Sequence, residues 1–359
     1  MKKYTVGVLG ATGTVGQRFV ALLESHPWFT VGAVAASPSS AGKTYAEAMD
    51  GRWAMGGEPV PPKTAKLTVL DAIADRQKVA ENVDLVFSAM AMSKGETKLL
   101  EDSYAKLECP VISNDSAHRF TPDVPMIIPE VNPHHAQIIP HFRKRMGVKR
   151  GLIAVKSNCS LQSYLPALHP LWEFGVERVL ACTYQAISGA GKSFKSWPEM
   201  IDNVIPLIPG EEEKSELEPL KIWGNIEDGV IVPANEPLIT TQCVRVPVTD
   251  GHMAAVFASF AQKPSLKEVA DRWRAYSGIP QALALPSAPK QFIHYFTDED
   301  RPQTKLDRGL ENGMAVSAGR LREDSQYDIK FISLSHNTLR GAAGGAVLLA
   351  ELLCAEGYI

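Results

Sequence analysis

Residues 7–16 read Gly7-Val8-Leu9-Gly10-Ala11-Thr12-Gly13-Thr14-Val15-Gly16, and this glycine turn decides the fold of the chain. It follows an apolar, β-like run at residues 4–9 and precedes a helical pattern at residues 17–25. Glycines at every third position let the backbone approach a pyrophosphate group, which then sits on the amino terminus of the helix. The spacing is not a strict G-x-G-x-x-G, so a tight turn with close strand–helix packing remains the alternative. The context favours a dinucleotide site, with predicted contacts at Gly10, Ala11, Thr12, Gly13, Thr14 and Val15.

The pattern of the glycine turn continues along the first part of the chain. Strand-like runs alternate with helical stretches, at residues 29–36, 83–89, 110–113 and 126–128. This alternation is typical of parallel strands joined by crossover helices. We therefore expect an α/β domain of Rossmann type, a doubly wound parallel sheet.

The pattern of the sequence changes after Cys159. The β-rich runs become longer, at residues 179–187, 238–248 and 252–262, and a proline-rich stretch separates them at residues 198–219. These runs predict a second, α+β domain with a largely antiparallel sheet.

A chain of 359 residues exceeds the size at which one hydrophobic core usually stops growing, so two domains are expected. Residues 341–356 carry apolar side chains at helical spacing, and we expect this helix to return to the first domain. The predicted division is residues 1–157 with 337–359 for the dinucleotide-binding domain, and residues 158–336 for the second domain.

Composition limits the classes of function. The chain has 37 basic and 40 acidic residues, a net charge of −3, which does not suggest binding to nucleic acid. No run approaches 18 apolar residues, so we expect no membrane association and a cytoplasmic location. Five cysteines without regular spacing or a C-x-x-C pair argue against a disulfide framework and against a metal site.

The run Ser157-Asn158-Cys159-Ser160 is the strongest chemical signal. It lies between a strand-like stretch at residues 151–155 and a helix-like stretch at residues 161–174, which places Cys159 at the amino terminus of the predicted helix. Backbone N–H groups and the helix dipole there favour the thiolate, the form that attacks carbonyl carbon. The alternative is a small buried apolar residue, the usual state of a free cysteine.

The end of the second predicted strand indicates which dinucleotide binds. An NAD site usually carries an acidic residue there, which holds the ribose 2′-hydroxyl. Residues 35–43 contain no carboxylate and instead offer Ser37, Ser40 and Lys43, so NADP is favoured. The alternative is a polar loop with a solvated lysine.

Several motifs in one order carry a family resemblance. They are the turn at residues 10–16, the cysteine run, and the segments at residues 184–191, 211–214, 245–252 and 337–344. Together they resemble the aspartate-β-semialdehyde dehydrogenase family, in its archaeal and fungal branch. The resemblance implies reductive dephosphorylation of L-aspartyl 4-phosphate to L-aspartate 4-semialdehyde with NADPH through a cysteine thioester, in the biosynthesis of lysine, threonine, methionine and isoleucine. It also implies a homodimer or homotetramer built on the second, catalytic domain.

The resemblance also assigns roles to single residues. It implies Cys159 as nucleophile, His252 as general acid/base and Gln185 as the group that orients the intermediate. The implied substrate contacts are Arg245 for the carboxylate, Glu211 for the ammonium group, Arg119 and Lys214 for the phosphate, and Asn158. Without the family, His252 reads as a surface histidine after a turn and residues 211–214 as a solvated helix start.

On the cofactor side, the resemblance implies that Ser188, Gly189 and Gly191 lie near the nicotinamide and Asn337 near its carboxamide, with Ser88 in the same set. One departure concerns Pro38-Ser39, which stand where an arginine is common in this branch. A guanidinium is a strong partner for a 2′-phosphate, so its absence bears on the strictness of NADP over NAD.

Three alternatives remain open at this stage. Malonyl-CoA reductase uses the same cysteine chemistry, but its substrate has no ammonium group for Glu211 to neutralise. N-acetyl-γ-glutamyl-phosphate reductase shares the glycine turn but is expected to differ around the cysteine. An inactive NADP-binding homologue is disfavoured because Cys159, Arg245 and His252 are all present.

Overall fold

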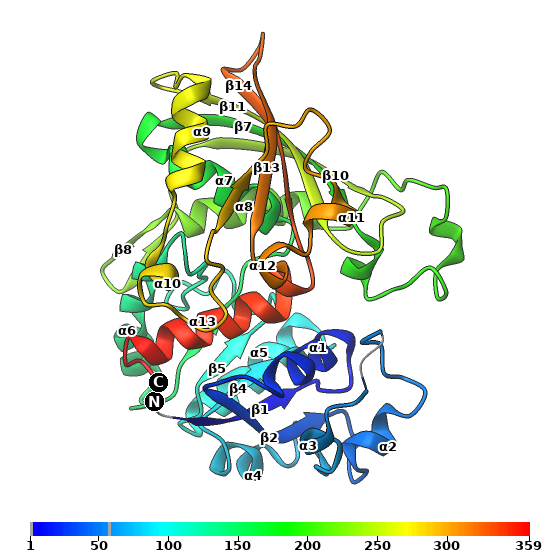
Figure 1. Ribbon diagram of the computed structural model, residues 1–359. Coiled ribbons are helices and arrows are strands. Elements are labelled where there is room, and N and C mark those ends of the chain that lie inside the picture. Colours follow the sequence, from blue (N-terminus) through cyan, green and yellow to red (C-terminus); the bar gives the residue numbers. More distant parts are fainter. Residues whose placement is uncertain (1–2, 57–58) are drawn as a thin grey trace.

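The computed structural model describes residues 3–56 and 59–359, which build two six-stranded sheets. Figure 1 shows the first sheet, in blue and cyan, on one side of helix α13 (Gly344–Ala355) and the second sheet, in green to orange, on the other. A two-stranded ribbon of β8 (Asn225–Glu227) and β9 (Val230–Val232) lies outside both sheets. In the described part of the chain, no helix is both long and apolar enough to cross a membrane.

The first sheet is parallel throughout, in the order β3-β2-β1-β4-β5-β6. Its strands are β1 (Tyr4–Leu9), β2 (Phe29–Ala36), β3 (Val69–Asp71), β4 (Leu85–Ser88), β5 (Val111–Ser113) and β6 (Ile153–Val155). Its helices are α1 (Thr14–Leu23), α2 (Tyr45–Met49), α3 (Pro62–Ala65), α4 (Arg76–Glu81), α5 (Lys94–Lys106) and α6 (Ile139–Met146). The strand order changes direction beside β1, and right-handed crossovers then place the helices on both faces. The expected doubly wound sheet of Rossmann type is confirmed.

One predicted strand of this domain is wrong. Residues 126–128 contribute a single bridge, between Met126 and Val155, and no strand. Pro125 and Pro129 flank the segment, and proline has no N–H to donate to a ladder. The apolar run is nevertheless fully buried, as its hydrophobicity requires.

The second sheet is mixed, in the order β10-β7-β11-β14-β13-β12. Its strands are β7 (Val176–Gln185), β10 (Leu238–Arg245), β11 (His252–Phe260), β12 (Ile293–Tyr295), β13 (Val316–Glu323) and β14 (Ile329–Ser335). The inner pairs are antiparallel, as predicted, whereas the edge pairs β10–β7 and β12–β13 run parallel. Its helices are α7 (Leu165–Leu168), α8 (Glu211–Ile222), α9 (Leu266–Ala275), α10 (Ile279–Ala282), α11 (Thr304–Asp307) and α12 (Leu310–Gly313).

The helix predicted at residues 161–174 is broken into three pieces. A 3-10 turn (Leu161–Ser163), the short α7 and a second 3-10 stretch (His169–Phe174) follow one another. Pro166 and Pro170 each stand at the start of a piece, because neither can donate the backbone hydrogen bond of a continuous helix. Cys159 therefore precedes a 3-10 turn of only three residues, and the predicted helix amino terminus behind it is wrong.

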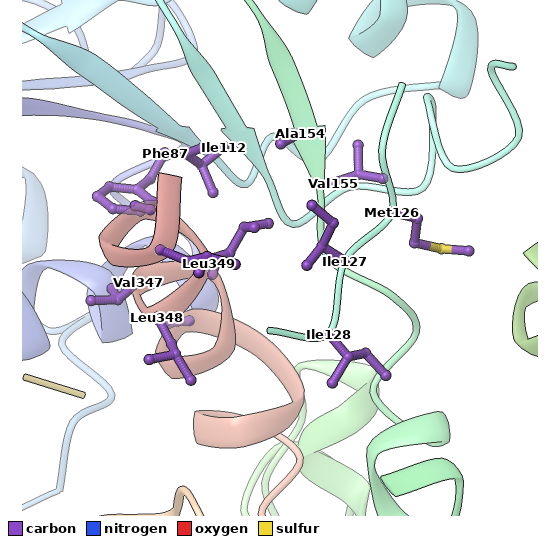
Figure 2. Packing of buried hydrophobic residues seen from close by; sticks show 14 of the residues in the cluster. Phe87, Ile112, Met126, Ile127, Ile128, Ala154, Val155, Val347, Leu348 and Leu349 are labelled. Carbon is purple, nitrogen blue, oxygen red and sulfur yellow. The ribbon is translucent and has the colours of Figure 1, made fainter. Parts of the chain in front are cut away.

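Helix α13 joins the core of the first sheet, as its apolar spacing predicts. Every residue from Gly344 to Leu353 is buried, and the helix contacts α1 and β5. Figure 2 shows Val347 and Leu349 of α13 packed among the side chains of Phe87 on β4 and Ile112 on β5. Burial of one such aliphatic side chain stabilises a fold by roughly 1.5–3 kcal/mol, so the helix is integral to the first sheet.

Candidate active site

A cavity of about 400 Å³ opens where the ends of strands from both sheets meet. Strands β5 and β6 of the first sheet end next to it, and β7 and β10 of the second sheet end in register, with Gln185 beside Arg245. Seven of the predicted substrate and catalytic residues line the cavity: Arg119, Asn158, Cys159, Gln185, Glu211, Lys214 and Arg245. Predicted cofactor residues also line it, namely Val15, Ser188, Gly189 and Asn337.

The cysteine and histidine singled out from the sequence are adjacent. The Sγ atom of Cys159 lies 3.5 Å from Nε2 of His252, and the backbone N–H of Ala186 donates to Nδ1 of the same ring at 3.1 Å. His252 is completely buried, so its interpretation as a surface histidine is wrong. Because Nδ1 accepts a hydrogen bond, Nε2 carries the proton in the neutral ring and faces the sulfur.

The electrostatics of this pair differ from the expected helix-end thiolate. Burial raises the pKa of the Cys159 thiol above its ordinary value, and the charge of Glu211 acts in the same direction. Lys156, Arg119 and Arg245 oppose this rise. Burial, and then Arg245, lower the pKa of His252 to about 3. The cations around the sulfur, rather than a helix dipole, are thus the groups that favour the thiolate.

Glu211, Lys214 and Arg245 form the charged wall of the cavity. Glu211 begins α8, as a helix-start interpretation expects, but it is buried instead of solvated. The Nζ atom of Lys214 lies 3.3 Å from Oε2 of Glu211. The Nη1 group of Arg245 donates to the carbonyl of Ala186 at 2.7 Å, which fixes the guanidinium beside the Cys159–His252 pair.

Arg119 and Asn158 approach the cavity from the first sheet. The Nη1 group of Arg119 donates to Oε1 of Glu218 at 2.8 Å, and its Nε donates to the carbonyl of Lys156 at 3.1 Å. The backbone N–H of Asn158 donates to Oε2 of Glu218 at 2.6 Å. The Oδ1 atom of Asn158 accepts from the backbone N–H of Ser160 at 2.7 Å, so this side chain shapes the loop that presents Cys159.

The geometry of the glycine turn is compatible with both interpretations of its sequence, a tight turn with close strand–helix packing and a site for a dinucleotide. Gly10 has φ +78°, and a Cβ on it would lie 2.2 Å from the carbonyl of Ala89, while a Cβ on Gly16 would lie 2.1 Å from the carbonyl of Gly10. These two glycines therefore serve close packing. Gly13 caps α1 without such a clash, and the first N–H groups of the helix, at Thr14 and Val15, have no partner within it. The resulting cradle fits a pyrophosphate.

A loop of the second sheet faces the glycine turn. A Cβ on Gly191, which has φ +67°, would lie 4.0 Å from Oγ1 of Thr14. The Nδ2 group of Asn337 donates to Oγ of Ser188 at 2.8 Å, and its Oδ1 accepts from the N–H of Gly251 at 2.8 Å. These bonds fix this loop, whose residues are those predicted to lie near the nicotinamide, opposite the glycine turn.

A side chain on Gly189, in the same loop, would crowd Arg245 and His252. Its Cβ would lie 2.9 Å from Nη1 of Arg245 and 3.1 Å from Nε2 of His252. Glycine at this position therefore lets the loop approach the reacting pair closely.

The loop after β2, predicted to bind the 2′-phosphate, offers mainly hydroxyl groups. Ser37 and Ser39 are exposed with their Oγ atoms 3.0 Å apart, Lys43 is exposed, and Ser40 is buried. Asp71, at the end of β3, lies in register with Ala36, but its Oδ1 accepts from two N–H groups of its own turn. Ser88 is buried and does not itself line the cavity. Its Oγ donates at 3.1 Å to Oδ2 of Asp115, which does line the cavity.

Other cavity residues were not predicted. Lys156, Asn114, Ser116, Thr338 and Gly341 also line the cavity. Burial, and then Arg119, lower the pKa of Lys156 to about 7. A usable signal existed for Asn114 and Ser116, because they follow a predicted parallel strand, and ligands bind at the carboxyl ends of such strands.

Comparisons with known proteins bear on both halves of the chain. Residues 5–139 match the model of the semialdehyde dehydrogenase NAD binding domain, and residues 168–340 match that of the semialdehyde dehydrogenase dimerisation domain. Aspartate-semialdehyde dehydrogenase of Aspergillus fumigatus is 42% identical over 99% of both chains. The enzyme of that name from Methanothermobacter thermautotrophicus is 40% identical over 97% of this chain and 98% of its own.

Solved structures agree with these matches. The Candida albicans aspartate semialdehyde dehydrogenase with NADP covers 100% of both chains at 37% identity, with a TM-score of 0.89. Aspartate semialdehyde dehydrogenase II of Vibrio cholerae, complexed with ASA, covers 99% of both chains at 26% identity, with a TM-score of 0.74.

Proposed function

The chain belongs to the aspartate-semialdehyde dehydrogenase family, and on that premise we propose how its residues carry out the NADPH-dependent reductive dephosphorylation of L-aspartyl 4-phosphate to L-aspartate 4-semialdehyde. The observation that carries the proposal is the 3.5 Å contact of Cys159 Sγ with His252 Nε2 in a cavity walled by Glu211, Lys214 and Arg245. A nucleophile, a proton donor and charges of both signs thus surround one small space.

Substrate recognition rests on charge. The fork of Arg245 binds the substrate carboxylate in two parallel hydrogen bonds, and the buried Glu211 binds the ammonium group. Arg119 and Lys214, which both line the cavity, bind the phosphate. The resulting pattern of one anionic contact and three cationic contacts matches an α-amino acid that carries an acyl phosphate.

Cys159 performs the covalent step. Its thiolate attacks the acyl carbon, the C–S bond forms, and the C–O bond to the phosphate group breaks from a tetrahedral intermediate. Inorganic phosphate leaves toward Arg119 and Lys214, and Gln185 orients the acyl group that remains on sulfur. NADPH, when bound, supplies the hydride that reduces the thioester carbon, and the C–S bond then breaks to release the aldehyde and the thiolate of Cys159.

His252 acts as the proton donor beside the sulfur. Its neutral ring holds a proton on Nε2, because the N–H of Ala186 occupies Nδ1. This proton lies next to the place where negative charge develops on the substrate oxygen and on the leaving sulfur. Because the N–H of a neutral imidazole is a very weak acid, these hydrogen bonds support His252 as a hydrogen-bond donor to the developing charge. The acid half of its expected role requires the ring to be protonated in the covalent intermediate.

The cofactor is NADP, and we propose that the turn at Gly10 to Val15 holds its pyrophosphate. Ser37, Ser40 and Lys43 would contact the 2′-phosphate. Ser88, Ser188, Gly189, Gly191 and Asn337 would contact the nicotinamide half. The open cradle at Gly13 and the close approach at Gly189 fit such a ligand.

The assembly and the domain division remain proposals. The second domain matches a dimerisation family, and β11 alternates between buried residues and half-buried ones such as Met253 and Phe257, which leaves one face of its sheet partly open. We propose a homodimer or homotetramer through this face, which light scattering would distinguish. We also propose that residues 1–157 with 337–359 form the dinucleotide-binding domain and that residues 158–336 form the catalytic domain. We propose a cytoplasmic location for the protein.

The decisive experiment compares substrates on the purified protein. We expect reduction of NADP by aspartate semialdehyde that depends on inorganic phosphate, and much slower oxidation of NADPH by malonyl-CoA. A CoA thioester of a dicarboxylic acid would leave Glu211 buried without a cationic partner on the substrate, which costs binding energy. Preference for malonyl-CoA would overturn the proposal.

A further inference from the structure

One face of helix α8 reaches from the cavity wall to the loop behind it. Glu211 and Lys214 in its first turns line the cavity, and Glu218 lies about one turn beyond Lys214 on the same face. The side chain of Glu218 is completely buried. Burying a carboxylate costs free energy unless both of its oxygens accept hydrogen bonds or pair with a cation.

The two carboxylate oxygens of Glu218 bind two different parts of the site. Oε1 accepts from Nη1 of Arg119 at 2.8 Å, and Oε2 accepts from the backbone N–H of Asn158 at 2.6 Å. The first contact orients a side chain that lines the cavity. The second fixes the main chain one residue before Cys159.

We propose that Glu218 is a positioning residue that holds the phosphate-binding arginine and the nucleophile loop in one fixed relationship. The proposal rests on the proposed function, because it takes Arg119 as a phosphate ligand. It assigns Glu218 no contact with substrate and no proton transfer.

The same helix also fixes the main chain of Arg119. The Nζ group of Lys221 donates to the carbonyls of Arg119, Thr121 and Val124, at 2.7, 2.8 and 2.8 Å. With Nε bound to the carbonyl of Lys156, Nη1 bound to Glu218 and Nη2 3.4 Å from the carbonyl of Asn114, every nitrogen of the guanidinium has one protein partner. An arginine held at both ends loses little further rotamer freedom when an anion binds.

The position of Glu218 links the two proposed steps of the reaction. The group that receives the departing phosphate and the loop that carries the sulfur share one carboxylate. A shift of Arg119 is therefore transmitted to Asn158 and, through it, to the loop of Cys159. Placement errors of about 1 Å in such groups cost enzymes roughly 10²-fold in rate.

The experiment uses the full chain with Glu218→Gln and, as a matched control, Glu351→Gln. Glu351 is also completely buried and binds His26 and Ser287, but it lies in α13 and does not line the cavity. With Glu218→Gln we expect the KM for phosphate in the oxidative direction to rise about tenfold or more, because hydrogen bonds of a charged group are lost, with an unchanged KM for NADP. The iodoacetamide reaction of Cys159, measured without substrate, should change by at least about threefold.

A double-mutant cycle separates positioning from general damage. In an Arg119→Leu background, Glu218→Gln should no longer change the KM for phosphate, whereas purely structural effects would add. If Glu218→Gln does not fold, Glu218→Asp, which keeps the charge but shortens the reach, should still raise the KM for phosphate. The proposal would be overturned if Glu218→Gln altered the KM for phosphate and the alkylation of Cys159 no more than Glu351→Gln does. It would also be overturned if the effects of Glu218→Gln and Arg119→Leu on the KM for phosphate were additive.

The alkylation measurement keeps this proposal distinct from the proposed function. If the native protein failed to oxidise aspartate semialdehyde, the proposed function would fail. An effect of Glu218→Gln on the reactivity of Cys159 would still show that the carboxylate positions the nucleophile loop.

Discussion

The ring of His252 is held between the Sγ atom of Cys159, 3.5 Å from Nε2, and the backbone N–H of Ala186, 3.1 Å from Nδ1. Burial and Arg245 lower the pKa of this histidine to about 3, so the ring is neutral at physiological pH. The free enzyme therefore does not hold an imidazolium–thiolate pair. Its reactivity depends instead on the cations around the sulfur, Lys156, Arg119 and Arg245.

The reactivity of Cys159 should follow this arrangement. Because burial raises the pKa of its thiol, the rate of alkylation in the substrate-free protein should increase with pH into the alkaline range. Iodoacetamide labelling followed by mass spectrometry would measure it, with Cys159→Ser as the unlabelled control. A rate that is already constant below pH 6 would contradict this environment, and preferential labelling of Cys109 or Cys354 would contradict a nucleophile at 159.

Turnover should require the same sulfur. Cys159→Ser should bind NADP normally and lose at least about 10³-fold in kcat, since a hydroxyl without a strong base is a poor nucleophile. Cofactor binding is measured by fluorescence titration and turnover by NADPH formation. Near-native turnover would exclude a covalent intermediate at this position.

His252→Gln removes the Nε2 proton donor while leaving a polar side chain. We expect kcat to fall by about 10²- to 10⁴-fold, the usual contribution of general acid–base catalysis, with little change in KM for the substrate. The native pH profile of kcat/KM should show no inflection near pH 6.5 from this residue, because its pKa lies near 3. An inflection there that disappears in the variant would show that the ring titrates normally.

The charged wall should decide substrate binding. Arg245→Leu and Glu211→Gln each leave a charge of the substrate unpaired, at a cost on the order of 2–5 kcal/mol in transition-state binding. Steady-state kinetics should show the loss in kcat/KM. Alkylation of Cys159 should persist in both variants, slower in Arg245→Leu because Arg245 lowers the pKa of the thiol, and faster in Glu211→Gln because Glu211 raises it. If Glu211→Gln oxidises aspartate semialdehyde as fast as the native protein, Glu211 does not bind the ammonium group.

Cofactor preference tests the hydroxyl-lined loop after β2. The native protein should prefer NADP, and Ser37→Asp should shift the preference toward NAD, because a carboxylate repels the 2′-phosphate. The ratio of kcat/KM for the two cofactors measures the shift. Equal native values would mean that the arginine missing at Pro38-Ser39 matters more than the absent carboxylate.

Buried histidines should make the fold sensitive to acid. Burial lowers the pKa of His135 and of His169 to about 4, whereas an unfolded chain binds these protons near pH 6.5. Their contribution to stability is therefore complete above pH 6.5 and is lost as the pH falls toward 4, at about 1.4 kcal/mol per pH unit for each proton.

Thermal unfolding at pH 7.5 and 5.0 checks this dependence. His169→Asn, which keeps an acceptor for Nε1 of Trp223, should lose less stability between the two values than the native protein does. His141→Asn, at an exposed histidine, serves as the control and should show the native difference.

The pattern of apolar residues in the sequence correctly predicted those strands and helices that depend mainly on neighbouring residues in the chain. Strand β2 was predicted to the residue, because its apolar run from Phe29 to Ala36 is bounded by the break at His26-Pro27 and by Ser37-Pro38. The strand predicted at residues 126–128 and the continuous helix predicted at residues 161–174 were wrong, because the apolar pattern was considered without the prolines that interrupt or flank these segments.

The family resemblance, and not local pattern, assigned Cys159, Arg245 and His252 to one site. The structure brings them together with Arg245 at the end of β10 and His252 at the start of β11.

Burial of charge was beyond the reach of the sequence. Nothing local distinguishes Glu218 or Lys156 from a solvated residue, since their burial follows from the docking of α8 on the first domain's loops. The raised pKa of the Cys159 thiol has the same origin. Such properties belong to the assembled fold and not to any window of sequence.

The order of synthesis gives helix α13 a further consequence. The ribosome makes every strand of the first sheet before residue 156, yet the helix that packs on β5 beside α1 is made only after all strands of the second sheet. A nascent chain therefore carries an open apolar face, including Phe87 and Ile112, for the time needed to translate nearly 200 residues. Chaperones that bind exposed apolar surface should engage this chain until α13 emerges, and translation pauses before residue 344 should lower the yield of folded protein.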